Sequence, residues 1–313
     1  MPARDKTAKT VLSKRGVIPM IEIVVPDGSM QEPVMNLFAK AGLSVSIEKK
    51  RTKEGMVAEV EWIERVAFQR PQEIPHYVNN GHFDIGIVGE DWIANWGYNL
   101  PILLSLPIGR SGNKPVKIVL AVSESADFQE IEDLPRDCEV ATEYVQLAQK
   151  FFHENGRSDI LVVPSFGNTE HKIQFGATAI IDVTESGESL RENRLRVICE
   201  IMESNTVMVA NPRSLADKTK QPYIDFFVRL IHGAYQASQY VMLTANVPEQ
   251  VLEKASKIIG GLKGPSCSPL MLKGWVALQS VVPKKDEKNI MFRLLQIGVT
   301  DIVVVWDIPT IMT

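Results

Sequence analysis

The segment from Ile180 to Asn193, IIDVTESGESLREN, combines residue types that can bind a phosphate. An apolar, β-branched run ends in an acid, and a turn rich in serine, glycine and glutamate follows it. Hydroxyl groups at Thr184, Ser186 and Ser189 offer donors, and Gly187 permits the backbone conformations that direct amides at an anion. The charged stretch that comes next predicts a helix. The pattern therefore predicts a phosphate-binding loop, with an ordinary turn after a strand as the alternative.

Two acids at the start of this loop suit a sugar. Asp182 and Glu185 carry carboxylates, which can accept hydrogen bonds from two neighbouring hydroxyl groups of a ribose. Either residue could instead be a solvated turn acid. Glu188 lies inside the loop and would repel a phosphate, so its side chain is expected to point outward.

A second group of charged residues follows other strands. Glu90 and Asp91 come directly after the apolar run FDIGIVG, where open α/β sheets place their ligand loops, although they could equally cap the next helix. Such acids can bind a base, a ribose or a hydrated Mg²⁺. Arg70 offers a permanent cation, or is a surface arginine. The basic run that ends at Lys53 is usually a solvated face and only occasionally a phosphate patch.

Strands and helices alternate along most of the chain, which predicts an α/β protein. Buried or alternating apolar runs predict strands at Met20–Val25, Trp62–Phe68, Phe83–Val88, Val116–Val122, Glu139–Ala141, Ile160–Val163, Ala179–Val183 and Thr206–Ala210. Helices are predicted at Glu32–Ala41, Pro71–Asn80 and Val145–Asn155. The rhythm changes after Gln239, where strands at Tyr240–Thr244, Ser266–Leu272, Trp275–Val282 and Ile302–Trp306 and helices at Pro248–Ile259 and Asp286–Ile297 predict a small βαββαβ domain.

The predicted organisation is two α/β lobes around a cleft, followed by this small domain. Lobe I comprises residues 1–110 and 205–237, lobe II residues 111–204, and the C-terminal domain residues 238–313. A Pro/Gly-rich stretch at 107–115 predicts the first crossover between the lobes. Two crossovers leave a cleft between the lobes, where a ligand belongs.

Composition excludes several classes of protein. The chain has 313 residues, 23% of them charged, and a net charge of -4, so nothing in it attracts nucleic acid or an anionic membrane overall. Its three cysteines lie far apart and predict free thiols in a reducing compartment. The five histidines show no metal-ligand spacing. A basic N-terminal arm lacks the apolar core of a signal peptide, so a cytoplasmic protein is expected.

Three stretches together resemble the long form of ATP phosphoribosyltransferase. They are the phosphate loop VTESGESLREN, the run RPQEIPHYVNNGHFDIGIVGED from Arg70 to Asp91, and SPLMLKGWVALQSVVP from Ser268 to Pro283. The three occur in the order found in that family. The resemblance extends over nearly the whole chain from Ile21.

The resemblance implies an enzyme of histidine biosynthesis that condenses ATP with phosphoribosyl pyrophosphate (PRPP), with Mg²⁺, to give phosphoribosyl-ATP and pyrophosphate. It implies two lobes like those of periplasmic binding proteins and a ferredoxin-like (ACT-like) C-terminal domain where histidine inhibits. It also implies a dimer or hexamer. By this likeness the PRPP site comprises Asp182, Glu185, Ser186, Gly187, Glu188, Ser189 and Leu190. The nucleotide and cleft residues are Asp27, Gly28, Ser29, Arg70, Gly89, Glu90, Asp91 and Glu170, and the regulatory ones Ser266, Cys267, Ser268 and Met271. No metal is held by protein ligands alone.

The chain departs from the family at the wall opposite the phosphate loop. Where the family has a lysine before the glycine of the first-strand loop, this chain has VPDGSM at Val25–Met30, with Asp27 and no cation. Glu143 stands where a cation is common, and Thr178 replaces an acid. Two alternatives therefore remain: a relative that uses PRPP with another acceptor, and a non-catalytic regulatory protein that binds an anionic metabolite.

Overall fold

The computed structural model describes residues 11–13, 16–49, 53–106, 108 and 115–311. The predicted N-terminal arm and most of the predicted crossover at 107–115 lie outside these residues. The chain divides into two compact units, residues 1–36 with 44–225 and residues 37–43 with 226–313. Among the described residues, no helix has the length and apolar character needed to span a membrane.

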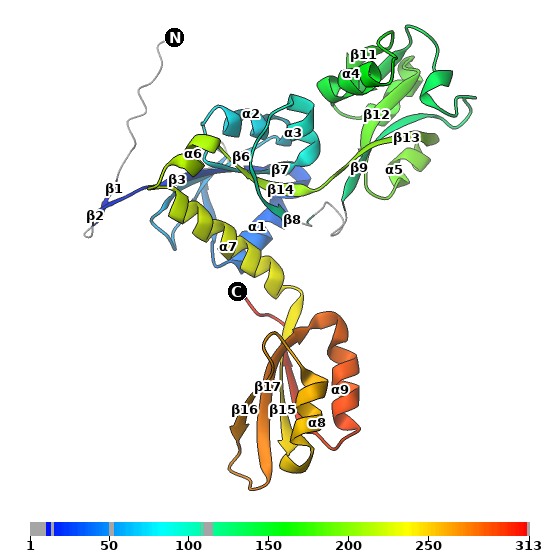
Figure 1. The fold of residues 1–313 in the computed structure, drawn as a ribbon. Coiled ribbons are helices and arrows are strands. Elements are labelled where there is room, and N and C mark those ends of the chain that lie inside the picture. The colour runs from blue at the N-terminus through cyan, green and yellow to red at the C-terminus, as the bar shows by residue number, and fades with distance from the viewer. Residues whose placement is uncertain (1–10, 14–15, 50–52, 107, 109–114, 312–313) are drawn as a thin grey trace. The chain divides into compact units, whose positions relative to one another are not determined.

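A mixed seven-stranded sheet forms the first lobe (Figure 1). Its strands, in spatial order, are β4 (Val45–Lys49), β5 (Glu54–Val57), β6 (Ile63–Gln69), β3 (Ile21–Pro26), β7 (Ile85–Gly89), β14 (Thr206–Ala210) and β8 (Ile102–Leu106). The helices α2 (Ile74–Asn79), α3 (Glu90–Trp96) and α6 (Pro212–Ala216) belong to the same compact unit, and α1 (Gln31–Lys40) and α7 (Gln221–Ala237) each begin in it and end in the second unit. Strand β3 pairs in parallel with both β6 and β7 and is almost wholly buried, as its continuous apolar run predicts.

A five-stranded sheet forms the second lobe. Its spatial order is β11 (Leu161–Pro164), β10 (Glu139–Thr142), β12 (Ala179–Thr184), β9 (Val116–Ser123) and β13 (Leu195–Ser204). Strand β10 is parallel to β11 and β12, and β9 is antiparallel to β12 and β13. Helix α4 (Val145–Glu154), helix α5 (Glu188–Glu192) and the 3-10 helix η4 (Thr169–Phe175) complete this lobe. The chain returns to the first sheet through Asn205 alone, between β13 and β14.

The C-terminal sheet is antiparallel, in the order β16 (Ser266–Pro269), β17 (Trp275–Pro283), β15 (Tyr240–Pro248) and β18 (Thr300–Val305). Every second residue of β15 is buried, and these residues pack on α8 (Leu252–Ile259) and α9 (Glu287–Leu295). The chain order β15, α8, β16, β17, α9, β18 confirms the predicted βαββαβ domain. The three-part division at the expected residue limits stays a prediction.

All the predicted strands form, with ends shifted by a few residues. Six further strands of the described chain were not predicted, namely β4, β5, β8, β13 and the two strands of a short N-terminal hairpin. Strand β13 carries charged residues at Arg196, Glu200 and Glu203 and two bulges, so its apolar residues do not keep a regular alternation. A short hairpin of β1 (Val11–Ser13) and β2 (Gly16–Ile18) precedes the first sheet.

Candidate functional site

The candidate residues of the first lobe follow the ends of its parallel strands. Asp27 comes directly after β3, Arg70 after β6 and Glu90 after β7. Because these three strands are parallel neighbours, their carboxyl ends meet at one edge of the sheet. Sheet topology alone therefore brings to one edge residues that are between about twenty and sixty positions apart in the sequence.

The second lobe repeats this arrangement. Glu143 follows β10, Glu170 lies in η4 after β11, and the predicted phosphate loop follows β12. These strands are also parallel neighbours, so the three segments gather at one edge.

The two edges enclose a cavity of about 580 Å³. Seven of the predicted site residues line it: Asp27, Gly28, Ser29, Arg70, Glu170, Asp182 and Ser189. Further lining residues are Met30, Pro71, Gln72, Trp92, Glu143, Tyr144, Asn168, Thr169 and Val183. The cavity is large enough for a nucleotide-sized ligand.

The phosphate loop has the left-handed glycine that its sequence predicts. Gly187 has a φ of 74° and directly precedes α5. Its amide donates to Oγ1 of Thr184 at 2.9 Å, and the amide of Glu188 donates to Oγ of Ser186 at 3.3 Å. These bonds hold the turn that opens the short helix.

The other residues of the loop line a second, smaller cavity or are buried in the core of the lobe. Glu185, Ser186 and Glu188 line a smaller cavity of about 170 Å³, which Ser189 shares with the large one. Glu188 is exposed and is not among the lining residues of the large cavity, and its expected outward position stays a prediction. The Leu190 side chain is buried in the core of the lobe, so only its backbone can reach a ligand.

A residue of the opposing wall pairs with a cation that the sequence pattern placed in a solvated face. The Lys53 ammonium lies 2.5 Å from Oδ2 of Asp27. The β4 and β5 hairpin carries this lysine to the first-strand loop, which itself lacks the lysine of the family. Sequence spacing gives no signal for this pair, because its members are 26 positions apart and a helix and a strand lie between them.

Acids outnumber cations in the lining of the large cavity. Asp27, Glu143, Glu170 and Asp182 line it together with Arg70. Oγ of Ser189 donates to Glu170 at 3.4 Å, which connects the loop to η4. Nowhere in the described part of the chain do three or more acidic, histidine or cysteine side chains meet in a geometry that could hold a metal ion.

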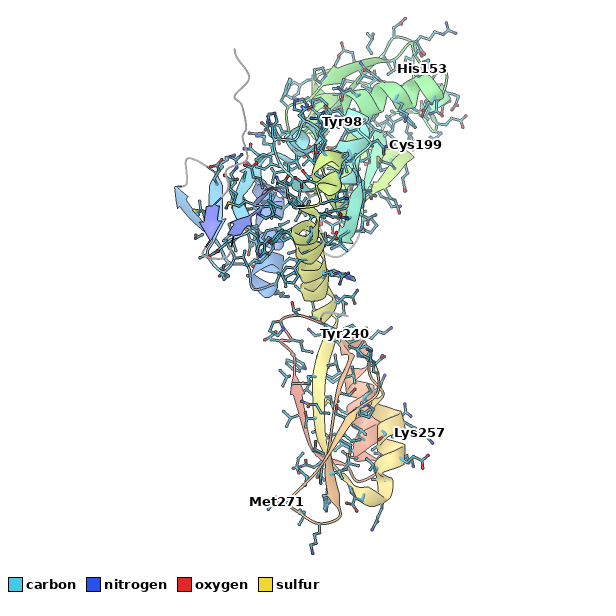
Figure 2. All side chains as sticks on the ribbon, turned by 60° about the vertical axis from the view of Figure 1, so that its left-hand side comes forward. Tyr98, His153, Cys199, Tyr240, Lys257 and Met271 are labelled. Carbon is cyan, nitrogen blue, oxygen red and sulfur yellow. The ribbon has the colours of Figure 1, made fainter. Side chains whose placement is uncertain are left out.

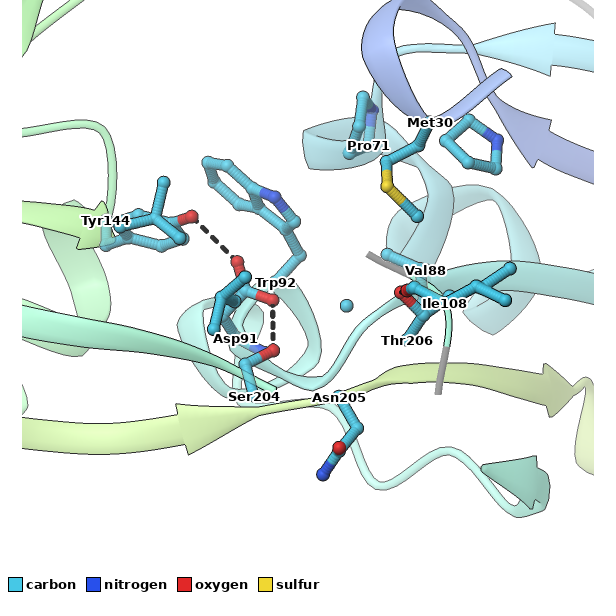
Figure 3. A pocket seen from close by; sticks show the side chains of 14 residues that line it. Met30, Pro71, Val88, Asp91, Trp92, Ile108, Tyr144, Ser204, Asn205 and Thr206 are labelled. Carbon is cyan, nitrogen blue, oxygen red and sulfur yellow. Dashed lines mark hydrogen bonds between the residues drawn. The ribbon is translucent and has the colours of Figure 1, made fainter. Parts of the chain in front are cut away.

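Glu90 and Asp91 contact the point where the chain passes between the sheets. A carboxylate oxygen of Glu90 accepts from the backbone amide of Asn205 at 2.9 Å and from its side-chain amide at 3.1 Å. Asp91 is only 4% exposed, accepts from Ser204 and Tyr144, and lines a separate apolar cavity of about 80 Å³ with Gly89 (Figure 3). Burial raises the pKa of the Asp91 carboxyl, and the hydrogen bonds from Ser204 and Tyr144 oppose that rise. Their expected role as ligands of the large cavity stays a prediction.

The expected regulatory residues lie at the exposed edge of the C-terminal sheet. Ser266, Cys267 and Ser268 belong to β16, whose residues are all exposed. Met271 follows in the turn toward β17 and is fully exposed (Figure 2). They are therefore accessible from solvent, and their regulatory role stays a prediction.

Family comparisons cover most of the chain. The model of the family described as HisG, ATP phosphoribosyltransferase, matches residues 70–233, and the model of the HisG C-terminal domain matches residues 237–307. The chain is 35% identical to the ATP phosphoribosyltransferase of Chlorobium phaeobacteroides over 279 residues, which are 89% of this chain and 93% of that protein. It is 34% identical to that of Pelotomaculum thermopropionicum, over 90% of this chain and 96% of the relative.

A solved structure shares the fold of the two lobes. A chain of the ATP phosphoribosyl transferase (HisG:HisZ) complex from Thermotoga maritima superimposes with a TM-score of 0.58 and 24% identity, over 68% of this chain and 97% of that one. The family models and the relatives in sequence agree over both the lobes and the C-terminal domain. The chain therefore belongs to the long form of the ATP phosphoribosyltransferase family.

Proposed function

We propose that this protein transfers the phosphoribosyl group of PRPP to ATP and releases pyrophosphate, the first step of histidine biosynthesis. The observation that carries the proposal is the 580 Å³ cavity, which Asp182 and Ser189 line together with Arg70 and the first-strand loop. PRPP carries a phosphate at one end and a pyrophosphate at the other. A ligand of this kind needs two anion-binding walls with sugar-binding groups between them.

The loop wall would hold the 5′-phosphate. Hydroxyl groups of Ser186 and Ser189 can donate to its oxygens, together with the backbone amides of Ser189 and Leu190. Asp182 lines the cavity beside Ser189 and is placed to accept hydrogen bonds from the ribose hydroxyls. The 5′-phosphate would fix the sugar so that its anomeric carbon faces the opposite wall.

The opposing wall would hold the pyrophosphate. Arg70 supplies a planar, permanent cation at the cavity, and Lys53 reaches the same wall through its pair with Asp27. When the bond from the anomeric carbon to the pyrophosphate oxygen breaks, the electron pair leaves with the pyrophosphate. Both cations would stabilise that developing charge. A ring nitrogen of ATP then bonds to the anomeric carbon, so no nucleophile of the protein is needed.

Mg²⁺ fits this cavity as a partner of the substrate phosphates. The ion typically takes one or two carboxylates and completes its shell with water and phosphate oxygens. Glu143, Glu170 and Asp182 supply carboxylates, while the described residues contain no preformed cage of three ligands. The ion would neutralise substrate phosphate charge in a cavity whose lining is mostly acidic.

Pyrophosphate release from PRPP and ATP with Mg²⁺ tests the proposal. Activity is expected in the purified protein and is expected to fall strongly in Ser189→Ala, because the loop would lose a donor to the 5′-phosphate. Calorimetric titration with PRPP supplies a second readout. If PRPP produced neither turnover nor binding heat, the proposal would be abandoned.

Feedback inhibition by histidine, a dimeric or hexameric assembly and a cytoplasmic location belong to the same proposal and rest on the family. The match of the C-terminal domain model to residues 237–307 supports the first of these. Saturating histidine is expected to lower the activity of the full chain. Unchanged activity would remove the regulatory role from Ser266, Cys267, Ser268 and Met271.

A further inference from the structure

One carboxyl group of the first lobe is buried where the two lobes and the crossover meet. Asp91 is the second residue of α3, and both of its oxygens are hydrogen bonded (Figure 3). Oη of Tyr144 donates to Oδ2 at 2.7 Å, and Oγ of Ser204 donates to Oδ1 at 2.6 Å. Tyr144 belongs to the second lobe and Ser204 ends β13, so a single carboxyl group joins three segments.

The backbone at this point is shaped around the same carboxyl group. Ser204 also accepts from the amide of Asp91 at 3.0 Å and thereby caps α3 from another part of the chain. A Cβ atom at Gly89 would lie 2.0 Å from the Asp91 carboxylate. Only glycine leaves room there, which gives Gly89 a packing role next to Asp91.

Two further contacts between the lobes surround this carboxyl group. The rings of Trp92 and Tyr144 stack with centroids 4.3 Å apart. Oδ1 of Asn95 accepts from the amide of Leu147 at 3.1 Å, so a residue of α3 caps the start of α4. Helices α3 and α4 are thus joined by hydrogen bonds and by ring stacking, all of them buried.

This contact lies beside the large cavity. Trp92 and Tyr144 line both the large cavity and the apolar one that contains Asp91. Any movement that separates these two rings would therefore also separate the loop wall from the wall of Arg70. A ligand that contacts both walls needs them at a fixed distance, since a displacement of about 1 Å can cost a hundredfold in rate.

We propose that Asp91 and Tyr144 are positioning residues that hold the two lobes at the separation which PRPP spans. The inference rests on the proposed function of the cavity. It predicts that weakening the bond affects ligands that bridge the walls and spares ligands that contact one wall. PRPP bridges the walls, whereas ribose 5-phosphate reaches only the phosphate loop.

The variant Tyr144→Phe tests this, because it removes the hydroxyl group and keeps the ring on Trp92. Its Kd for PRPP is expected to rise about tenfold, since a buried carboxyl oxygen that loses its hydrogen-bond partner keeps the full cost of its desolvation. Its Kd for ribose 5-phosphate is expected to stay within about twofold of the wild type, because the loop wall is unchanged. The KM for PRPP should rise by a similar factor, while the far-ultraviolet circular dichroism spectrum stays the same.

Tyr98→Phe is a matched control. Tyr98 lies within the first lobe, its hydroxyl is 2.9 Å from Nδ1 of His76, and its ring stacks on Trp96 (Figure 2). This variant also loses a tyrosine hydroxyl group from a stacked pair of aromatic rings. It should bind both ligands as the wild type does. If Tyr144→Phe failed to fold, Asp91→Asn carries the same expectation with a side chain of the same size.

Equal binding of PRPP by Tyr144→Phe and the wild type would overturn the inference, as would an equal loss of both ligands, which indicates local damage to the loop. A wild-type protein that binds ribose 5-phosphate but not PRPP would contradict the proposed function of the opposing wall. These outcomes differ, so the failure of one idea is distinguishable from the failure of the other.

Discussion

The two walls of the large cavity are built in different ways. The loop wall comes from one continuous segment, where Thr184, Ser186 and Gly187 set the turn by bonds over two or three residues. The opposing wall contains Asp27 and Arg70, which follow two different strands, and Lys53 pairs with Asp27 from a separate turn. The loop wall is a local motif, whereas the opposing wall exists only once the sheet has formed. A chain can therefore exchange the residues of the opposing wall while the loop keeps its pattern.

The largest expected effect belongs to Arg70. We expect Arg70→Gln to lower kcat/KM about a hundredfold, because removing a group that stabilises developing charge typically costs that much. The measurement is steady-state pyrophosphate release with PRPP varied. Arg136→Gln is the control, since it removes an exposed guanidinium that lines none of the three cavities. A decrease in kcat/KM of less than threefold would mean that the pyrophosphate does not bind at this wall.

Lys53 either replaces the lysine that the first-strand loop lacks or forms a simple surface ion pair with Asp27. Substitutions at both residues distinguish these two roles. Lys53→Met is expected to raise the KM for PRPP about tenfold, since charge-assisted contacts are about twice as strong as neutral ones. Asp27→Asn is expected to lower this KM severalfold, because it removes a negative charge and frees Lys53.

Salt provides a second measurement of this pair. Both effects should shrink between 0.05 and 0.5 M salt, because exposed charges are screened over about 10 Å at 0.1 M. Lys257→Met, which breaks an exposed pair with Glu253 in the C-terminal domain, should leave the KM unchanged. An increase in KM in both Lys53→Met and Asp27→Asn would mean that Asp27 is itself a ligand.

The two walls also differ in how far the sequence predicts them. The phosphate loop was predicted residue by residue, because hydroxyl groups, a left-handed glycine and a following helix are local features. Arg70 and Asp27 were expected at the cavity from the resemblance to the family, and Arg70 also because it offers a permanent cation. Lys53 was missed because its strands β4 and β5 are short and carry charged residues. The hairpin pairing that delivers Lys53 has no local signature.

Glu90 and Asp91 show where local sequence patterns no longer predict the contacts of a residue. Their place after a buried strand is typical of ligand residues, and the sequence analysis assigned them to the cleft. The structure shows them bonded to Ser204, Asn205 and Tyr144, and a contact with a ligand stays a prediction. Whether an acid at a strand end faces a ligand or a crossover depends on where β14 joins the sheet. That pairing connects residues more than one hundred positions apart, so local patterns do not encode it.

Gly187 tests the local character of the loop wall. A side chain at a φ of 74° costs about 1–2 kcal/mol, so Gly187→Ala should lower the free energy of unfolding by about that amount. A Cβ atom there would lie 3.3 Å from Nη1 of Arg191, a flexible group that can move. We therefore expect strain rather than a clash, with PRPP binding about fivefold weaker. Urea unfolding and calorimetry measure the two effects. If Gly187→Ala also abolished the effect of Arg70→Gln on kcat/KM, the two walls would not be independent.

The smallest expected effect is a pH dependence of the free energy of unfolding. It comes from Asp91, whose hydrogen bonds join the two lobes. Burial raises the pKa of Asp91, so the folded protein binds this proton more tightly than the unfolded chain does. The stability contributed by Asp91 is therefore complete below the ordinary carboxyl pKa of about 3.9 and is lost as the pH rises through the raised value. Asp91→Asn has no such proton, so the free energy of unfolding of the wild type relative to this variant should fall with rising pH. Urea unfolding at several pH values from 4 to 8 measures it. A difference that increased with pH would mean that the bonds from Tyr144 and Ser204 outweigh the burial, and the carboxylate form would then be the one that joins the lobes.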